Sequence, residues 1–316
     1  MTSRTRLGPW RASTTPAAGA AVMATGIVSA DLASDKRHAL SLVLLALAAV
    51  VWLALGSLLL TRMAEDWPGV LRHARVPAAL TGVAATAVLG ARATGLGWGS
   101  VAVALLVLAA VLWLILLPLV LSRPPAKAAG VAFMATVSTQ SLAVLAAQVA
   151  LRSRAPWLLY PALGLLALGL LLYVVVLATF DLRQLLVGRG DHWVSGGALA
   201  ISALAAARLT LGFGGLHELP GALAALRAVT LALWVLSAAW LPALIVAELA
   251  RPRWGYDVRR WATVFPVGMY AACSFDAGRA VRVSGLTEFA QVWVWFALAL
   301  WVLVFLAAVW RAAAAG

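Results

Sequence analysis

The chain has 316 residues, of which 64% are hydrophobic and only 11% are charged, and its mean hydropathy is +0.98. A soluble domain carries roughly 25% charged residues, so this composition excludes a soluble enzyme or binding domain. The formal net charge of +13 does not indicate nucleic acid as a partner. The basic residues are scattered through short loops, where Lys and Arg set the orientation of a membrane protein.

Apolar runs of about 20 residues recur along the whole chain, which predicts an all-α, polytopic membrane protein. We expect ten transmembrane helices, at approximately 17–33, 38–61, 77–92, 97–122, 128–150, 156–180, 193–209, 221–249, 261–279 and 286–311. The loops between them are too short for a soluble domain. We therefore expect residues 1–316 to form a single membrane-embedded domain with a short cytoplasmic tail of about residues 1–15 and no removable signal peptide.

The odd and even spans differ in composition. Odd spans are shorter and rich in Gly, Ala, Thr and Ser, whereas even spans are longer and dominated by Leu, Val and Trp. This alternation predicts five helical hairpins, with small-residue helices inside and apolar helices facing lipid. The alternative is that the small residues only mark helix–helix interfaces, because they allow backbones to approach closely.

Lys and Arg indicate the orientation. They are nearly twice as frequent in the N-terminal tail, the C-terminus and the loops after even spans as in the opposite loops. Basic residues are retained on the cytoplasmic side, so we expect a protein of the cytoplasmic membrane with both termini in the cytoplasm.

Charged residues are scarce within the spans, and the few present constrain the transport chemistry. Five of them fall at expected span ends, where we expect them to reach the interface: Asp31, Asp181, Arg208, Glu248 and Arg279. We expect no carboxylate near the middle of an odd span. Proton-driven carriers and cation pores usually need such acids, so the pattern favours a passive route for anions or neutral solutes.

The odd spans supply the candidate pore-lining residues, most of them small or able to hydrogen-bond. They are Met23, Thr25, Gly26, Thr81, Gly82, Phe133, Thr136, Thr139, Gln140 and Ser202. A hydrogen-bonding lining can partly replace the hydration of a solute. The alternative is that the hydroxyls bond back to carbonyls of their own helices, while Gln140 pairs with a neighbouring helix.

The ninth span contains a candidate gate. Pro266 has no N–H and Gly268 weakens the next turn, so we expect a helix break at Pro266 and Gly268, directly after the bulky Phe265. Broken helices are tolerated in membranes where protein or a water-filled cavity surrounds them. We therefore expect this segment to line a pathway that Phe265 obstructs; the alternative is a proline-kinked packing helix.

Other function classes lack the residues they need. A membrane enzyme requires a nucleophile–base pair or a metal cluster, and the nearest pair is His192 beside Asp191 in a loop. The single Cys273 excludes an internal disulfide and any Cys-based metal site. We therefore expect no catalytic residues, metal or cofactor. A scaffold or receptor with no pathway is a further alternative, against which the broken odd helices argue.

Three segments carry a resemblance to a known family. Val22–Ser29, Ser138–Leu145 and Thr263–Tyr270 resemble the tellurite-resistance/dicarboxylate transporter family. It includes the bacterial tellurite-resistance channel homologue, malate permeases, sulfite exporters and the plant slow-type anion channels. The resemblance implies ten helices as five hairpins in a quasi-five-fold ring around a central pore, in each protomer of a homotrimer. It also implies that an aromatic residue, matched here by Phe265, occludes the pore.

These observations together predict channel-like passage of small inorganic or organic anions across the cytoplasmic membrane. The alternative is a coupled secondary carrier or exporter of C4-dicarboxylate, sulfite or tellurite-related anions. The expected partners are the lipid bilayer, small anions and further copies of the chain.

Overall fold

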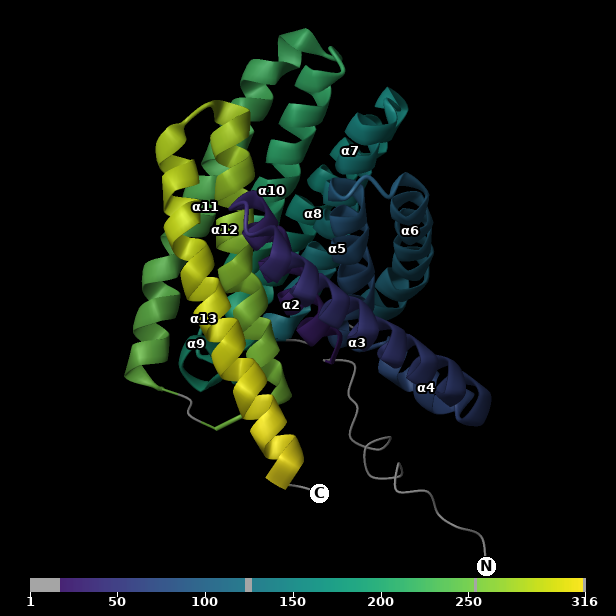
Figure 1. Ribbon diagram of the computed structural model, residues 1–316. Coiled ribbons are helices and arrows are strands. Elements are labelled where there is room, and N and C mark those ends of the chain that lie inside the picture. The colour runs from purple at the N-terminus through teal and green to yellow at the C-terminus, as the bar shows by residue number, and fades with distance from the viewer. Residues whose placement is uncertain (1–17, 123–126, 253–254, 315–316) are drawn as a thin grey trace, which may run out of the picture.

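The computed structural model describes residues 18–122, 127–252 and 255–314, and most of these residues are helical. The expected N-terminal tail, about residues 1–15, lies outside the described residues. Figure 1 shows a bundle of long helices joined by short connections.

A long helix lies at each of the ten expected ranges. These helices are α2 (Gly19–Ser34), α3 (His38–Glu65), α5 (Thr81–Gly95), α6 (Gly99–Leu121), α7 (Met134–Ser153), α8 (Leu159–Thr179), α10 (Val194–Gly215), α11 (Leu223–Ala250), α12 (Trp261–Val281) and α13 (Ser284–Ala314). The short helices α4 (Trp67–Ala74) and α9 (Gln184–Val187) lie in connections. Short 3₁₀ turns, such as Pro77–Leu80 and Gly130–Phe133, lead into several long helices.

Not every long helix could cross a membrane alone. Among the described residues, seven helices are long and apolar enough to do so, or up to eight if Trp67–Ala74 and Pro77–Gly95, bent by 90°, form one span. Neither α2, with 16 residues, nor α12, which carries Asp276 and Arg279, is among them. The prediction of an all-helical, polytopic membrane protein is confirmed. That all ten long helices cross the membrane stays a prediction.

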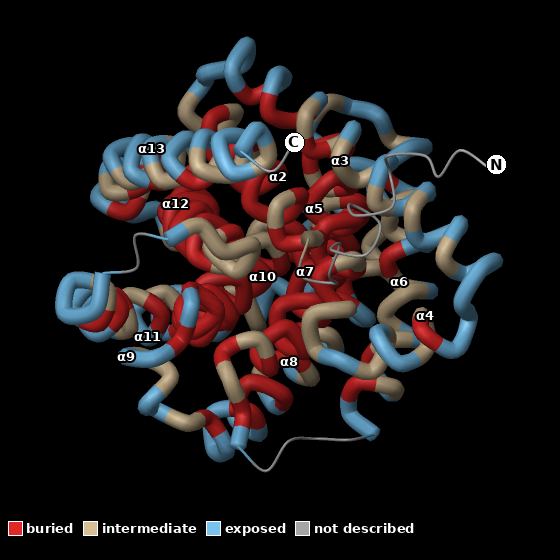
Figure 2. The backbone as a smooth tube through the Cα atoms, turned by 90° about the horizontal axis from the view of Figure 1, so that it is seen from below, coloured by how far each residue is buried: buried red, intermediate tan, exposed pale blue. Residues whose placement is uncertain are grey.

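Consecutive helices pack as hairpins: α2 with α3, α5 with α6, α7 with α8, α10 with α11 and α12 with α13. The first helices of the hairpins also pack against one another in the order α2, α5, α7, α10, α12, and α12 packs against α2. We call these five the inner helices and their partners the outer helices. Seen from below in Figure 2, buried segments gather at the centre, and exposed surfaces lie around them.

Burial follows composition. In the apolar windows of the α7 and α10 spans, 94% and 89% of residues are buried, against 17–33% for the spans that contain the five outer helices. Large apolar side chains on the outer helices, such as Leu60, Leu114 and Leu303, are exposed. Such a surface suits lipid, because hydrocarbon chains solvate Leu side chains as well as another helix does.

Glycine allows α12 to approach its neighbours closely. A Cβ added to Gly197 of α10 would lie 2.8 Å from the Pro266 side chain, and one added to Gly268 would lie 2.7 Å from Cγ2 of Ile27 on α2. Both distances are well inside van der Waals contact. Glycine at these two positions is therefore required by helix packing, as small residues often are inside membranes.

Tryptophan side chains join neighbouring hairpins. In four cases an indole N–H on an outer helix donates to a hydroxyl on the inner helix of the next hairpin. The pairs are Trp52–Thr86 at 3.0 Å, Trp113–Thr139 at 2.9 Å, Trp234–Ser274 at 2.8 Å and Trp301–Thr25 at 2.9 Å. The repetition of one contact type between successive hairpins indicates a structural repeat in the chain.

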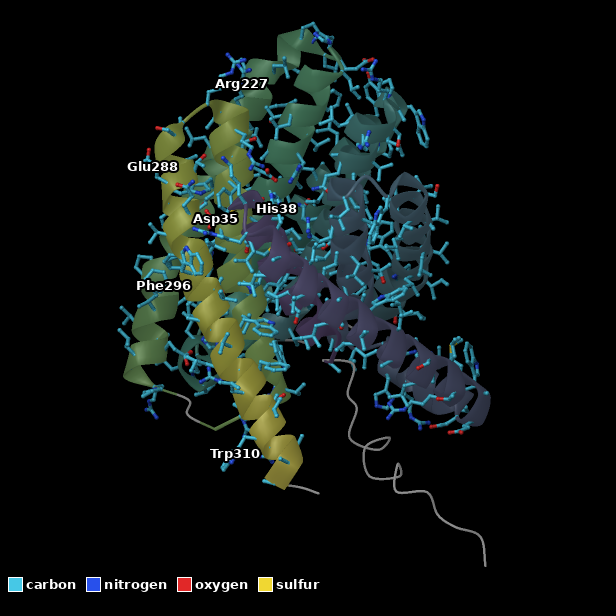
Figure 3. All side chains as sticks on the ribbon, viewed as in Figure 1. Asp35, His38, Arg227, Glu288, Phe296 and Trp310 are labelled. Carbon is cyan, nitrogen blue, oxygen red and sulfur yellow. The ribbon has the colours of Figure 1, made fainter. Side chains whose placement is uncertain are left out.

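Replacing Trp113 by phenylalanine should lower the free energy of unfolding by about 0.5–1.5 kcal/mol, the net value of a typical hydrogen bond. The ring keeps most of its apolar contact, but the bond to Thr139 is lost. Thermal unfolding in detergent measures the change. Trp310→Phe is the control, because Trp310 is 76% exposed near the C-terminal end of α13 (Figure 3). Equal stabilities of the two variants would show that the indole bond contributes nothing.

Candidate functional site

A cavity of about 390 Å³ lies among the N-terminal ends of the inner helices. We call it the large cavity. Every inner helix, or the turn that leads into it, contributes to its wall. Lining residues include Ala20, Met23, Ala78, Thr81, Val131, Met134, Asp191, Val194, Arg259, Ala262 and Phe265.

A second cavity, of about 50 Å³, lies nearer the C-terminal ends of the same helices, and we call it the small cavity. Its lining residues include Ile27, Asp31, Ala87, Val88, Ser141, Gln148, Ile201, Arg208, Met269 and Asp276. Each inner helix lines first the large cavity and then the small one. The two cavities therefore follow one another along the axis of the inner helices.

Phe265 lies where the large cavity ends. It is the last residue of α12 to line the large cavity, and Met269, one turn further on, lines the small one. Phe265 is only 1% exposed. At the same level of the other inner helices, the last residues lining the large cavity are Met23, Thr81, Met134 and Val194. These five residues form a mostly apolar layer, which we call the Phe265 layer.

The helix around Phe265 is continuous. α12 runs from Trp261 to Val281 with Pro266 inside it. Pro266 packs against Gly197, and Gly268 packs against Ile27 and lies close to Asp31. Pro266 therefore does not end the helix, and a functional hinge at Pro266 and Gly268 stays a prediction.

Two of the candidate pore-lining residues, Met23 and Thr81, line the large cavity. Others make different contacts. The Thr25 hydroxyl donates to the Ala21 carbonyl and accepts from Trp301, and Ser202 donates to the Ala198 carbonyl. Gly26 packs against Val88, while the space beside Gly82 is open.

The polar candidates on α7 contact the outer helices. Thr139 donates to the Ala135 carbonyl and accepts from Trp113 of α6, while the Gln140 amide donates to the Leu166 carbonyl of α8 at 3.1 Å. Thr136 shares their helix face by its spacing of three and four residues. The alternative drawn from the sequence, own-helix carbonyls for hydroxyls and a neighbouring helix for Gln140, describes the contacts of Thr139 and Gln140. The Thr136 hydroxyl does not follow it, because it is buried with no hydrogen-bond partner among the described residues.

Phe133, the remaining candidate, packs against two aromatic rings, one of them on the outer helix α8. Its ring lies 5.1 Å from that of Tyr173 on α8 and 5.4 Å from that of Phe180. Such tilted and edge-on aromatic contacts stabilise packing between helices. The contacts of Phe133 are therefore those of a packing residue between α7 and α8.

The wall of the large cavity contains guanidinium groups that are paired with carboxylates. Arg189 and Arg259 line it together with Asp191. Both arginines also pair with Asp257, at 3.6 Å and 2.8 Å. The hydrogen bond from the Arg259 side chain lowers the pKa of Asp257, so this carboxylate stays charged at neutral pH. The two guanidinium groups keep N–H donors for an anion, while Asp191 and Asp257 balance their charge.

The small cavity contains two acids, Asp276 and Asp31. The carboxylate of Asp276 accepts from Arg208, and from Arg279 at 3.2 Å. With its amide oxygen turned toward Arg208, Gln148 accepts from the same guanidinium at 3.1 and 3.2 Å. Asp31 also lines this cavity. The chain thus encloses two carboxylates and a guanidinium beyond the Phe265 layer.

The expectation that Asp31 reaches the membrane interface is wrong, because Asp31 is buried among the inner helices, with 1% of its surface exposed. Helical spacing was the signal that could have revealed this. Met23, Ile27 and Asp31 are four residues apart and share a face, as do Phe265, Met269, Ala272 and Asp276. Extending the face that carries Phe265 leads directly to Asp276.

Comparison with known proteins agrees with the resemblance noted in the sequence. Two membrane proteins of Mycobacterium tuberculosis, from strains CDC 1551 / Oshkosh and H37Rv and described as uncharacterized, are each 28% identical over 158 residues. The aligned segment covers 47% of this chain and 74% of each relative. The model of the SLAC1 family, described as voltage-dependent anion channel, matches residues 13–309. A family of anion channels also excludes the enzymatic alternative. Because the match covers nearly the whole chain, the protein belongs to the voltage-dependent anion channel family.

Proposed function

We propose that this protein is a channel for small anions in the cytoplasmic membrane, with a pathway along the axis of the inner helices and a gate at Phe265. One observation carries the proposal: every inner helix lines both cavities in the same order, and Phe265 lies at the level where they are separated. A cavity on each side of an apolar layer is the arrangement expected of a closed pore.

We further propose that all ten long helices cross the membrane as a quasi-five-fold ring. α2, which is short, and α12 are not among the candidate spans, yet both are inner helices. An inner helix contacts protein and a cavity rather than lipid. It can therefore be shorter and can carry Asp31 or Asp276, which a lipid-facing helix could not. With both termini in the cytoplasm, the large cavity faces the cytoplasm and the small cavity faces outward.

The hydrogen-bond donors around the large cavity support anions as the solute. An anion entering from the cytoplasm meets the guanidinium groups of Arg189 and Arg259, whose charges are balanced by Asp191 and by Asp257, with which both arginines pair. At the Phe265 layer it meets mainly Met, Val and Phe side chains, which offer no hydrogen bond in place of lost water. The apolar layer therefore forms the barrier, and its desolvation cost is several kcal/mol.

Flux measurements with the purified protein in liposomes test this function. We expect anion currents that follow the electrochemical gradient of the anion, with no requirement for a second ion. A strict requirement for a proton gradient would instead support the coupled carrier. An anion series of chloride, sulfite, a C4-dicarboxylate and tellurite then identifies the substrate class.

Neutralising two basic residues on the proposed outer side should lower anion flux at low salt. Arg152 and Arg154 are exposed at the C-terminal end of α7. Exposed positive charge attracts anions within a Debye length of about 10 Å at 0.1 M salt. We expect Arg152→Gln with Arg154→Gln to reduce flux at low ionic strength and to leave it unaltered at high ionic strength. Unchanged flux in both conditions would exclude a steering role.

We propose a homotrimer, as the family resemblance implies. The inner helices are used around the pathway, so contacts between protomers must come from the Leu- and Trp-rich outer helices. Mass measurement in mild detergent tests this assembly, and a species of one or two chains only would contradict it.

A further inference from the structure

The small cavity contains a carboxylate whose surroundings do not match its charge. Asp31 is 1% exposed, and within the part of the chain that the structure describes neither of its oxygens has a hydrogen-bond partner. The side chain lies close to Gly268 of α12, and the neighbouring charge is the carboxylate of Asp276. A buried, unpaired carboxylate beside a like charge is unfavourable, because burial removes its hydration and its neighbour repels it.

The basic groups near Asp31 form ion pairs or hydrogen bonds with other residues. Arg208 of α10 and Arg279 of α12 both donate to Asp276. Arg92 of α5 approaches α2 at Ser29, where its guanidinium donates to the hydroxyls of Ser29 and Ser41. None of these arginines is shown to bond Asp31, so the ionised form of this side chain lacks compensation.

The other titratable groups on elements packed against α2 do not supply a counter-charge. Cys273 of α12 is a buried thiol. His38 at the start of α3 and Glu288 of α13 are exposed to solvent, and Asp35 at the end of α2 pairs with Arg37. Figure 3 labels Asp35, His38 and Glu288, which lie near the upper ends of their helices.

We propose that Asp31 is a proton-binding site in the pathway and that its protonation permits anions to pass the small cavity. The proton comes from the outer solution, because the small cavity lies toward the C-terminal ends of the inner helices. Protonated Asp31 is neutral and offers an O–H donor to a passing anion. Ionised Asp31 joins Asp276 to give the cavity a second negative charge, which repels the anion. Proton binding therefore regulates passage from the far side of the Phe265 layer.

The effect on transport rests on the proposed channel function, whereas proton binding does not, and the two are measured separately. Infrared difference spectra of the wild-type protein and Asp31→Asn, recorded at about pH 5, detect a protonated buried carboxyl by its C=O band. We expect the wild type to show a band that Asp31→Asn lacks. Asp35→Asn is the matched control: it removes a carboxylate four residues away and should keep the band. Identical spectra of the wild type and Asp31→Asn would overturn the proposal.

Flux is then measured in the Phe265→Ala background, so that the gate does not limit the rate, with equal pH on both sides of the membrane. From about pH 5 to about pH 10, a range that covers documented buried carboxyls, anion flux should fall at least about tenfold. The repulsion between ionised Asp31 and a passing monovalent anion, taken about 8 Å apart at an effective dielectric constant of about 20, is large enough for such a fall. Adding Asp31→Asn should remove the pH dependence, whereas adding Asp35→Asn should keep it.

The outcomes separate the two ideas. The same pH dependence with and without Asp31→Asn overturns the regulatory role. Absence of flux from every variant, including Phe265→Ala, contradicts the channel itself, and the infrared comparison then still decides whether Asp31 holds a proton.

Discussion

Phe265→Ala should raise basal anion flux severalfold or more, because it removes the largest side chain of the layer that separates the two cavities. The ring blocks passage by occupying space, and it offers a permeating anion no hydrogen bond in place of lost water. Both effects disappear with the ring, and the remaining layer of Met, Thr and Val leaves a gap about the size of a phenyl group. Flux into liposomes at equal protein density measures the change.

The competing interpretation is that Phe265 only fills the core. In that case Phe265→Ala would leave a cavity, cost about 3–5 kcal/mol of stability and give no gain of flux. Phe275→Ala is the matched control, because Phe275 is on the same helix, is equally buried at 1% exposure, and is not a residue that lines either cavity described above. We expect both variants to lose stability but only Phe265→Ala to conduct more.

Pro266→Ala tests the role of the α12 backbone in gating separately from that of the Phe265 ring. It restores a hydrogen-bond donor in α12 while leaving Phe265 in place, so it should alter gating without opening the pore. If the basal flux of Pro266→Ala equals that of Phe265→Ala, the α12 backbone at Pro266, and not the Phe265 ring, closes the pore.

The positions of the helices could be predicted from the sequence because apolar run length is a direct consequence of membrane thickness. The starts of α3 and α12, at residues 38 and 261, agree with the expected ranges, and the other helix ends differ by one to six residues. The distinction between inner and outer helices was also visible, since Gly and Ala in α10 allow close packing while Leu and Trp in α13 suit lipid. Charge at the ends of α2 and α12 was harder to interpret, because composition alone does not tell which helices lipid touches.

The candidate site was predicted only in part. Phe265 could be identified because a bulky ring next to proline in a small-residue helix is unusual. The polar lining could not be identified, because the partner of a hydroxyl such as that of Thr139 depends on which way its helix face is turned. Its partner, Trp113, lies 26 residues away on α6, and only the packed structure reveals that pair. Asp31 was misplaced for a related reason: a position near a helix end does not determine burial when the helix lies inside the bundle.

Arg208→Met should destabilise the protein by about 3 kcal/mol or more, the expected cost of removing one partner from a buried ion pair. Asp276 is 2% exposed and lies beside Asp31. Without Arg208 its charge has only Arg279 as a salt-bridge partner, and the Arg279 side chain is 47% exposed. The destabilisation follows from the charge left behind in the small cavity, since methionine fills much of the volume of the arginine side chain. Chemical denaturation in detergent micelles measures it.

Two further variants show whether the uncompensated charge is the cause. Arg279→Met removes the exposed partner of the same carboxylate, and we expect a loss of about 1 kcal/mol or less, because solvent screens that pair. Adding Asp276→Asn to Arg208→Met removes the stranded charge and should restore most of the lost stability. If the double variant is no more stable than Arg208→Met, the loss comes from packing around the arginine stem, and the small cavity does not depend on charge pairing for its stability.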